Sequence, residues 1–223
     1  MSKLFKKIIF PFASLIMFTS VLYSLYMIFM VVPDEKIMGP VQRVFYFHVG
    51  SAIACYVAFG IVLAGSVGFL ATKEVKFDIY NVAAGEVGFV FCTITLLSGM
   101  IWGNAAWNTP FQWEPRLVTF LLLWLIFLTF IILRIFAEPT LVRTHSAVLG
   151  IIGALLVPVV WYSVKLMPAA LQLHPQVVEN RGLKDVRFYY GMIAGITSLI
   201  ILEVYLIWLR VRLGFLQHNM RNK

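Results

Sequence analysis

The sequence predicts an all-α, polytopic membrane protein with about six transmembrane helices. Of its 223 residues, 61% are hydrophobic and only 13% are charged, whereas soluble domains are about half apolar and a quarter charged. The apolar residues gather into runs near the roughly 20 residues that a helix needs to cross the hydrocarbon layer. Because a helix satisfies its own backbone polar groups, as lipid requires, an all-α bundle follows.

Six such runs follow one another along the chain, and they predict a single integral-membrane domain over residues 1–223. The runs are 8–32, 47–71, 82–102, 117–136, 147–167 and 188–209. The length leaves no room for a separate soluble catalytic domain. Basic residues precede the first run, but it is too long for a signal-peptide core and lacks a small-residue cleavage site, so we expect it to remain as a span.

The connections between the runs alternate in character and predict the orientation. Eleven of the 18 Lys and Arg residues lie in the N-terminus, the turns at 72–80 and 134–145, and the C-terminus. Basic residues are retained on the cytoplasmic side, so both termini are expected there, with the three longer connections outside. The excess of Lys and Arg over Asp and Glu therefore indicates how the helices are oriented in a lipid bilayer, and no nucleic-acid partner is expected.

The two cysteines, Cys55 and Cys92, each stand inside an apolar run. No Cys-x-x-Cys or Cys-x-x-Cys-His occurs, so neither a dithiol redox site nor a covalent haem-attachment site is encoded. We expect both to be small buried hydrophobic residues. The sequence also lacks a phosphate-binding loop and a His-Glu-x-x-His motif, which argues against ATP hydrolysis and zinc proteolysis.

Residues 102–116 form an aromatic segment that is too broken by proline to span a bilayer and too aromatic for an ordinary loop. Its three indoles are Trp102, Trp107 and Trp113. Two interpretations stay open. Tryptophans gather at the headgroup level of many membrane proteins as an interfacial belt. Alternatively, the indoles form a platform for a flat apolar ligand with a charged edge.

Two histidines are predicted to lie on the same side of the membrane as this segment. His48 stands just inside the outer end of the second run, and His174 lies in the third outward connection, whereas His145 and His218 fall on the cytoplasmic side. A histidine at a helix end is often no more than a hydrogen-bonded interfacial residue. Two of them beside an aromatic platform, however, suit the axial ligation of a haem iron from opposite faces.

Charged residues near the predicted platform admit both structural and chemical interpretations. Arg116 and Arg43 lie on the side where they could engage haem propionates. Glu114 could serve as a general acid or proton relay, but Glu114-Pro115 suits a helix N-terminus, so we favour a local pair with Arg116.

Two acidic residues fall inside the predicted spans. Glu203 in the last run is a functional candidate because a charge in a span is costly. Pairing with Arg210, seven residues later on the same face, is the simpler explanation. We expect Glu86 to be paired in the same way.

These residues resemble the signature of the CcmC family (haem exporter protein C), membrane proteins that handle haem in cytochrome c maturation. That signature runs Trp-Gly, three residues, Trp-Gly, one residue, Trp-Trp, one residue, Trp-Asp, one residue, Arg-Leu. The matching residues are Trp102, Gly103, Trp107, Trp113, Arg116 and Leu117. The departures are Asn108, Pro110, Phe111 and Glu114, where the family has Gly, Trp, Trp and Asp. The similarity extends along nearly the whole chain.

The resemblance implies a specific function. In the family the two outward histidines are the axial ligands of non-covalent haem b, which carries over to His48 and His174, and the indoles are the haem platform. It implies a multi-pass protein of a prokaryotic inner membrane that delivers haem from its periplasmic face to the chaperone CcmE. The transporter subunits CcmA and CcmB and the small protein CcmD would be its partners. No bond need be made or broken, so an enzyme is not expected.

Two alternatives are kept. The related CcsA or CcmF type of synthetase attaches haem to apocytochrome thiols, and such chains usually have further spans and further histidines within the bilayer. No histidine lies mid-span here, which argues against that class. The other alternative is a small-molecule permease or a quinone-site membrane subunit without haem, in which the aromatic residues form a plain belt.

Overall fold

A computed structural model describes residues 3–36, 38–138, 141–166 and 185–221. Six helices among them are long and apolar enough to cross a membrane, and no β-strand occurs within the described ranges. The predicted all-α, polytopic fold is therefore confirmed.

Each helix begins before the apolar run that predicted it, and α2, α3 and α6 also end after it. Their bounds are α1 Lys3–Tyr26, α2 Val44–Thr72, α3 Val75–Trp107, α4 Pro115–Phe136, α5 Val142–Tyr162 and α6 Val186–Arg221. Short helical pieces are η1 Met27–Val31, η2 Pro40–Arg43 and η3 Ser163–Leu166. Because backbone hydrogen bonding continues past the apolar stretch, α3 includes Trp107. The first part of the aromatic segment is thus helical rather than irregular.

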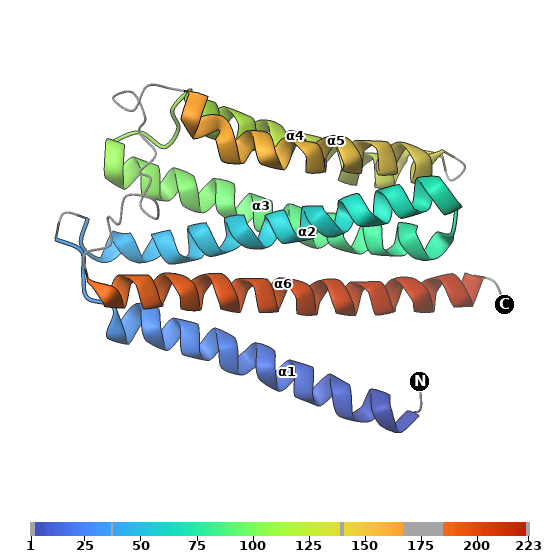
Figure 1. The fold of residues 1–223 in the computed structure, drawn as a ribbon, viewed down its shortest axis with the longest axis horizontal. Helices are drawn as coiled ribbons and strands as arrows, with labels where there is room; N and C mark the ends of the chain where they lie inside the picture. Colours follow the sequence, from blue (N-terminus) through green and yellow to red (C-terminus); the bar gives the residue numbers. More distant parts are fainter. Residues whose placement is uncertain (1–2, 37, 139–140, 167–184, 222–223) are drawn as a thin grey trace.

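The six helices run back and forth along one long axis, so the described ends of the chain lie at the same end of the bundle (Figure 1). We call this the terminal end; it also holds the short connections α2–α3 and α4–α5. The opposite end, which we call the site end, holds the α1–α2 and α3–α4 connections and the start of α6. Helix α1 packs mainly against α6.

Glycines bring α2 and α6 close together at the site end. A Cβ on Gly50 would lie 2.9 Å from the carbonyl oxygen of Gly195, and a Cβ on Gly195 would lie 2.9 Å from that of Tyr46. Small residues permit such close backbone approach in membrane bundles. The contact fixes the first turns of α6 beside the segment of α2 that carries His48.

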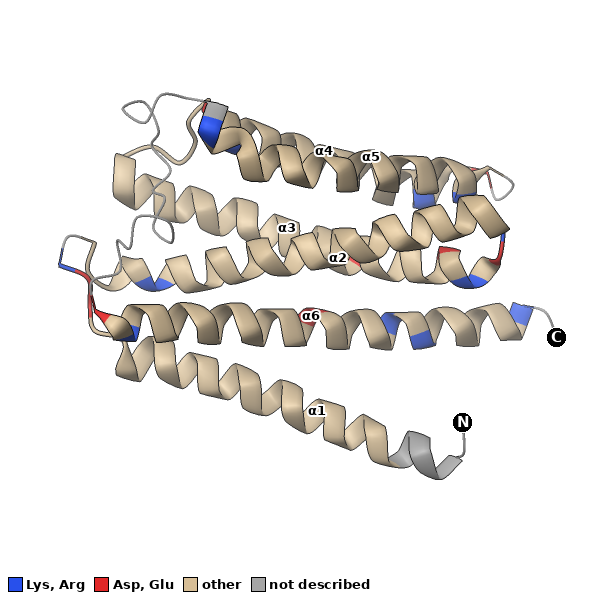
Figure 2. Ribbon diagram, viewed as in Figure 1, with Lys and Arg blue, Asp and Glu red and all other residues tan. Residues whose placement is uncertain are grey.

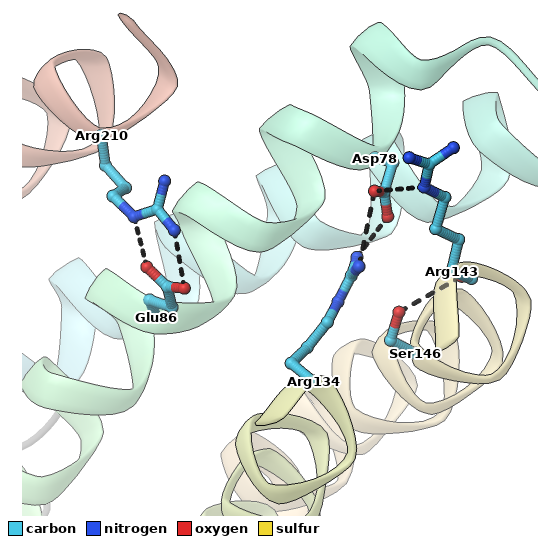
Figure 3. A network of polar contacts seen from close by, with 6 residues as sticks. All are labelled: Asp78, Glu86, Arg134, Arg143, Ser146 and Arg210. Carbon is cyan, nitrogen blue, oxygen red and sulfur yellow. Dashed lines mark hydrogen bonds and ion pairs between the residues drawn. The ribbon is translucent and has the colours of Figure 1, made fainter. Parts of the chain in front are cut away.

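Charged residues concentrate toward the two ends of the bundle, and its middle is mostly uncharged (Figure 2). At the terminal end, Asp78 of α3 forms ion pairs with Arg134 of α4 and Arg143 of α5 (Figure 3). These pairs hold α3, α4 and α5 together at this end.

The predicted pairing of Glu203 with Arg210 is wrong. Nε and Nη2 of Arg210 instead donate to Glu86 of α3, at 2.5 and 2.9 Å (Figure 3), so Glu86 is paired as expected. Seven residues place Glu203 about 10 Å from Arg210 along the helix axis, while a carboxylate on the neighbouring helix is within direct reach. Glu203 is fully buried, and neither of its carboxyl oxygens has a hydrogen-bond partner among the described residues.

Both cysteines are fully buried thiols, as the sequence predicted. They lie in a core to which α2, α3 and α4 contribute, where Phe59 of α2 stacks on Phe127 of α4 with ring centroids 3.7 Å apart.

Candidate functional site

A cavity of about 430 Å³ opens at the site end between α2, α3, α4, α6 and η3. Its volume falls within the range of about 300–1,000 Å³ that is typical of small-molecule and cofactor sites. The wall is mainly apolar and aromatic. Its rings come from Phe45, Tyr56, Trp102, Trp107, Phe111, Phe120, Trp161 and Tyr189.

Four of the residues singled out from the sequence line this one cavity. They are His48 from α2, Trp102 and Trp107 from the end of α3, and Arg116 from the start of α4. These positions are separated by up to 68 residues along the chain and converge because the bundle brings alternate connections to the same end.

His48 is held in a defined orientation by α3. Its Nδ1 lies 3.1 Å from the carbonyl oxygen of Thr95 and 3.3 Å from Oγ of Ser98. A carbonyl oxygen can only accept, so Nδ1 carries the hydrogen and Nε2 carries the lone pair. Histidine ligands of metals are commonly oriented by a hydrogen bond of this kind at the other ring nitrogen. The hydroxyl of Thr95 in turn donates to Oγ of Ser51 at 2.9 Å, which ties α3 back to α2.

Gly99 makes room for the imidazole. A Cβ at this position would lie 2.9 Å from Cε1 and 3.3 Å from Nδ1 of His48. Sequence reasoning missed Thr95, Ser98 and Gly99. The available signal was weak: Gly99 precedes Trp102 by one turn and so shares its helix face.

The indoles divide into two groups. Trp102 and Trp107 meet edge to face, with centroids 5.4 Å apart and planes at 89°. The helix ends directly after them, because Asn108 adopts a left-handed conformation with φ 55°. Trp113 is 82% exposed, contacts Phe111, and is not among the residues that line the cavity.

One buried donor at the cavity wall has no acceptor. The indole Nε1 of Trp102 is buried, and no hydrogen-bond partner for it occurs among the described residues. Buried N–H groups are nearly always paired, so this donor is an exception within the described part of the chain.

Glu114 and Pro115 start α4 as expected, but the expected local pair of Glu114 with Arg116 is not among the ion pairs of the described residues. Glu114 is the buried residue directly before the helix, and Pro115 occupies its first position. Arg116 then follows in the first turn and lines the cavity.

Arg43 lies outside the cavity wall. Its Nη2 forms a salt bridge with Oδ1 of Asp34 at 2.9 Å, and its guanidinium lies over the ring of Phe29. Lys165 of η3, which was not among the predicted site residues, lines the cavity instead.

His174 lies outside the described residues. The described residues on either side of that range do line the cavity: Val164 and Lys165 precede it, and Tyr189 follows it.

The similarity to known proteins covers the whole chain. The model of the family described as "CcmC: Heme exporter protein C" matches residues 1–223. The chain belongs to the heme exporter protein C family. The resemblance inferred from the aromatic segment is therefore confirmed.

Curated relatives agree with this family membership. Heme exporter protein C of Bradyrhizobium diazoefficiens is 30% identical over 133 residues, which is 59% of this chain and 51% of that protein. Heme exporter protein C of Paracoccus denitrificans is 25% identical over 182 residues, 81% of this chain and 76% of that protein. The matched part thus spans about half of the first relative and three quarters of the second.

A second kind of relative shares a shorter region. Cytochrome c biogenesis protein CcsA of Cuscuta reflexa is 31% identical over 99 residues, or 44% of this chain and 31% of that protein. The similarity of this chain to CcsA therefore covers less than half of the chain.

Proposed function

We propose that this protein binds non-covalent haem b in the cavity at the site end and delivers it to a haem chaperone for c-type cytochrome biogenesis. The observation that carries the proposal is the hydrogen bond from Nδ1 of His48 to the Thr95 carbonyl oxygen. It leaves the lone pair on Nε2, as iron ligation requires, in a wall that also holds three indoles.

The cavity fits the three chemical parts of haem. Its aromatic wall suits the wide apolar face of a porphyrin. His48 offers an imidazole for the iron. Among the described residues that line the cavity there is no Asp or Glu, whereas Arg116 and Lys165 are cationic, which suits the negative propionate edge.

We propose His174 as the second axial ligand. This assignment rests on the sequence and on the family, supported by the cavity-lining residues on both sides of the range that contains it. The family's position at Glu114 is also acidic, and we propose that this buried residue supports the start of α4 next to Arg116. Trp113 belongs to the family signature, but its exposure favours a role at the protein surface over contact with the ring.

The orientation and partners form part of the same proposal. We place both termini in the cytoplasm and the site end on the periplasmic face of a prokaryotic inner membrane, on the basis of the bias in Lys and Arg. The expected partners are the chaperone CcmE, the transporter subunits CcmA and CcmB, and CcmD. Holding and handing over a ligand breaks no covalent bond, so we propose transport rather than an enzymatic activity.

Titration of the purified protein with hemin in detergent tests the proposal. Wild type should develop a Soret band that saturates at one haem per chain. His48→Ala should weaken or shift this band, while the matched control His145→Ala, an exposed histidine at the terminal end, should not. Failure of wild type to bind hemin would refute haem handling, and an unchanged spectrum in His48→Ala would refute this ligand.

The similarity to CcsA favours a second candidate, in which the protein attaches haem to apocytochrome thiols. Incubating the haem-loaded protein with either a haem chaperone or a reduced Cys-x-x-Cys-His apocytochrome separates the two. Transfer to the chaperone alone supports delivery. Covalent attachment to the apocytochrome supports the synthetase.

A further inference from the structure

Two cationic side chains line the cavity and have no carboxylate partner within the described residues. Arg116 and Lys165 both line it, and neither forms an ion pair within the described part of the chain. Six other basic residues do contact an acid: Arg43, Lys76, Arg134, Arg143, Arg187 and Arg210.

The two cations come from neighbouring elements. Arg116 lies in the first turn of α4, and Lys165 lies in η3, which packs against α4. The N-terminus of a long helix adds a favourable field for an anion there. The ammonium of Lys165 also lies 5.5 Å from the centroid of the Tyr162 ring, which is a cation–π contact.

We infer that Arg116 and Lys165, not Arg43, form the anion subsite of the cavity, and that this subsite selects a ligand with carboxylates at its edge. Arg43 is already bound to Asp34 and lies outside the wall. The inference rests on the proposed function only in taking a porphyrin as the ligand.

The competing explanation is that Lys165 is a solvated residue at the membrane surface. In that case its replacement would change no ligand preference. If it binds a carboxylate, the charge-assisted bond contributes about a tenfold change in affinity or more, and only for ligands that carry the carboxylate.

The experiment compares hemin with hemin dimethyl ester, which has the same ring and iron but no free carboxylate. Wild type should bind hemin more tightly than the ester. Lys165→Met and Arg116→Met should each lower hemin affinity by about tenfold and leave ester affinity nearly unchanged. Arg43→Met is the matched control and should keep the wild-type preference. Thermal unfolding of each variant checks that the fold is retained.

Iron-free protoporphyrin IX, followed by its fluorescence, separates the anion subsite from the histidine. Lys165→Met should weaken its binding, whereas His48→Ala should not. The inference is overturned if wild type discriminates acid from ester but Lys165→Met discriminates equally well, or if Arg43→Met alone loses the preference. If wild type binds none of the three porphyrins, the proposed function fails with it.

Discussion

The imidazole of His48 occupies the space that a side chain at position 99 would fill. A Cβ on Gly99 would stand 2.9 Å from Cε1 of the ring, well inside van der Waals contact. The same ring is fixed by the carbonyl of Thr95, one turn earlier on α3. Helix α3 therefore both seats the histidine and sets its tautomer, although the histidine itself belongs to α2.

Gly99→Ala should displace the imidazole and weaken hemin binding by about tenfold or more, since a misplaced ligand loses its preorganised geometry. The fold should survive, because alanine favours a helix over glycine by up to about 1 kcal/mol. Hemin titration and thermal unfolding measure the two effects. The control is Gly60→Ala on α2, where no atom lies within 4 Å of the added Cβ. Equal affinity in both variants would contradict the role assigned to Gly99.

Trp107 and Trp113 should differ sharply although both belong to the family signature. Trp107 lines the cavity, and Trp113 is exposed beyond it. Trp107→Ala removes aromatic surface from a bound ring and should weaken hemin binding by about tenfold. Trp113→Ala should leave the binding of free hemin unchanged within about twofold. Titration of both variants in the same detergent checks this, and the reverse order would show that the aromatic segment rearranges around its ligand.

The fold could be predicted from the sequence because a chain segment that crosses lipid must satisfy its own backbone hydrogen bonds. Long apolar runs must be helices there, and their number and the alternating connections place alternate loops at one end. That reasoning put His48, Trp102 and Arg116 at a common end before any contact was known. Glu114-Pro115 likewise marked the start of α4 by local helix chemistry alone.

The sequence alone does not predict which residues of different helices contact one another. Whether Arg43 or Lys165 is available to bind an anionic group depends on the salt bridge between Arg43 and Asp34. Spacing along the chain does not predict that salt bridge. The pairing of Arg210 with Glu86 depends on how α3 and α6 face each other. Gly99 has meaning only once α2 lies against α3.

The two ion-pair groups at the terminal end should contribute unequally to stability. Asp78 and Arg134 have side chains only 9% and 12% exposed, whereas those of Glu86 and Arg210 are 37% and 28% exposed. Asp78→Asn leaves a buried guanidinium without its partner and should lower the free energy of unfolding by about 3 kcal/mol. Glu86→Gln should lower it by about 1 kcal/mol or less, because solvent screens that pair. Thermal or denaturant unfolding in detergent compares them, and equal losses would contradict the assigned difference in burial.

The orientation of the bundle can be measured with two single cysteines. Val41 lies in η2 at the site end, and Glu74 lies in the α2–α3 connection at the terminal end. In intact cells, or in spheroplasts where an outer membrane is present, a membrane-impermeant maleimide should label Val41→Cys and should reach Glu74→Cys only after lysis. The native cysteines are fully buried and serve as the unlabelled background. The opposite pattern would place the cavity on the cytoplasmic face and would remove delivery to a periplasmic chaperone from consideration.

Replacing Glu203 tests whether the protein keeps an energetically unfavourable buried carboxyl group because its function requires it. Its carboxyl group is fully buried in α6, and neither oxygen has a hydrogen-bond partner among the described residues. Burying such a group without a partner costs about 1–3 kcal/mol, so Glu203→Met, which keeps the length of the side chain, should raise the thermal midpoint. Glu138→Met, at an exposed acid of the terminal end, should leave it unchanged.

The two readouts of this substitution separate packing from function. A more stable Glu203→Met protein that binds and transfers haem normally would show that the carboxyl group is dispensable. A more stable protein that binds haem but no longer transfers it would show that the group is kept for function at the expense of stability, as ionisable residues inside membranes often are. A less stable protein would contradict the prediction, because it would require Glu203 to have a favourable partner in the folded bundle.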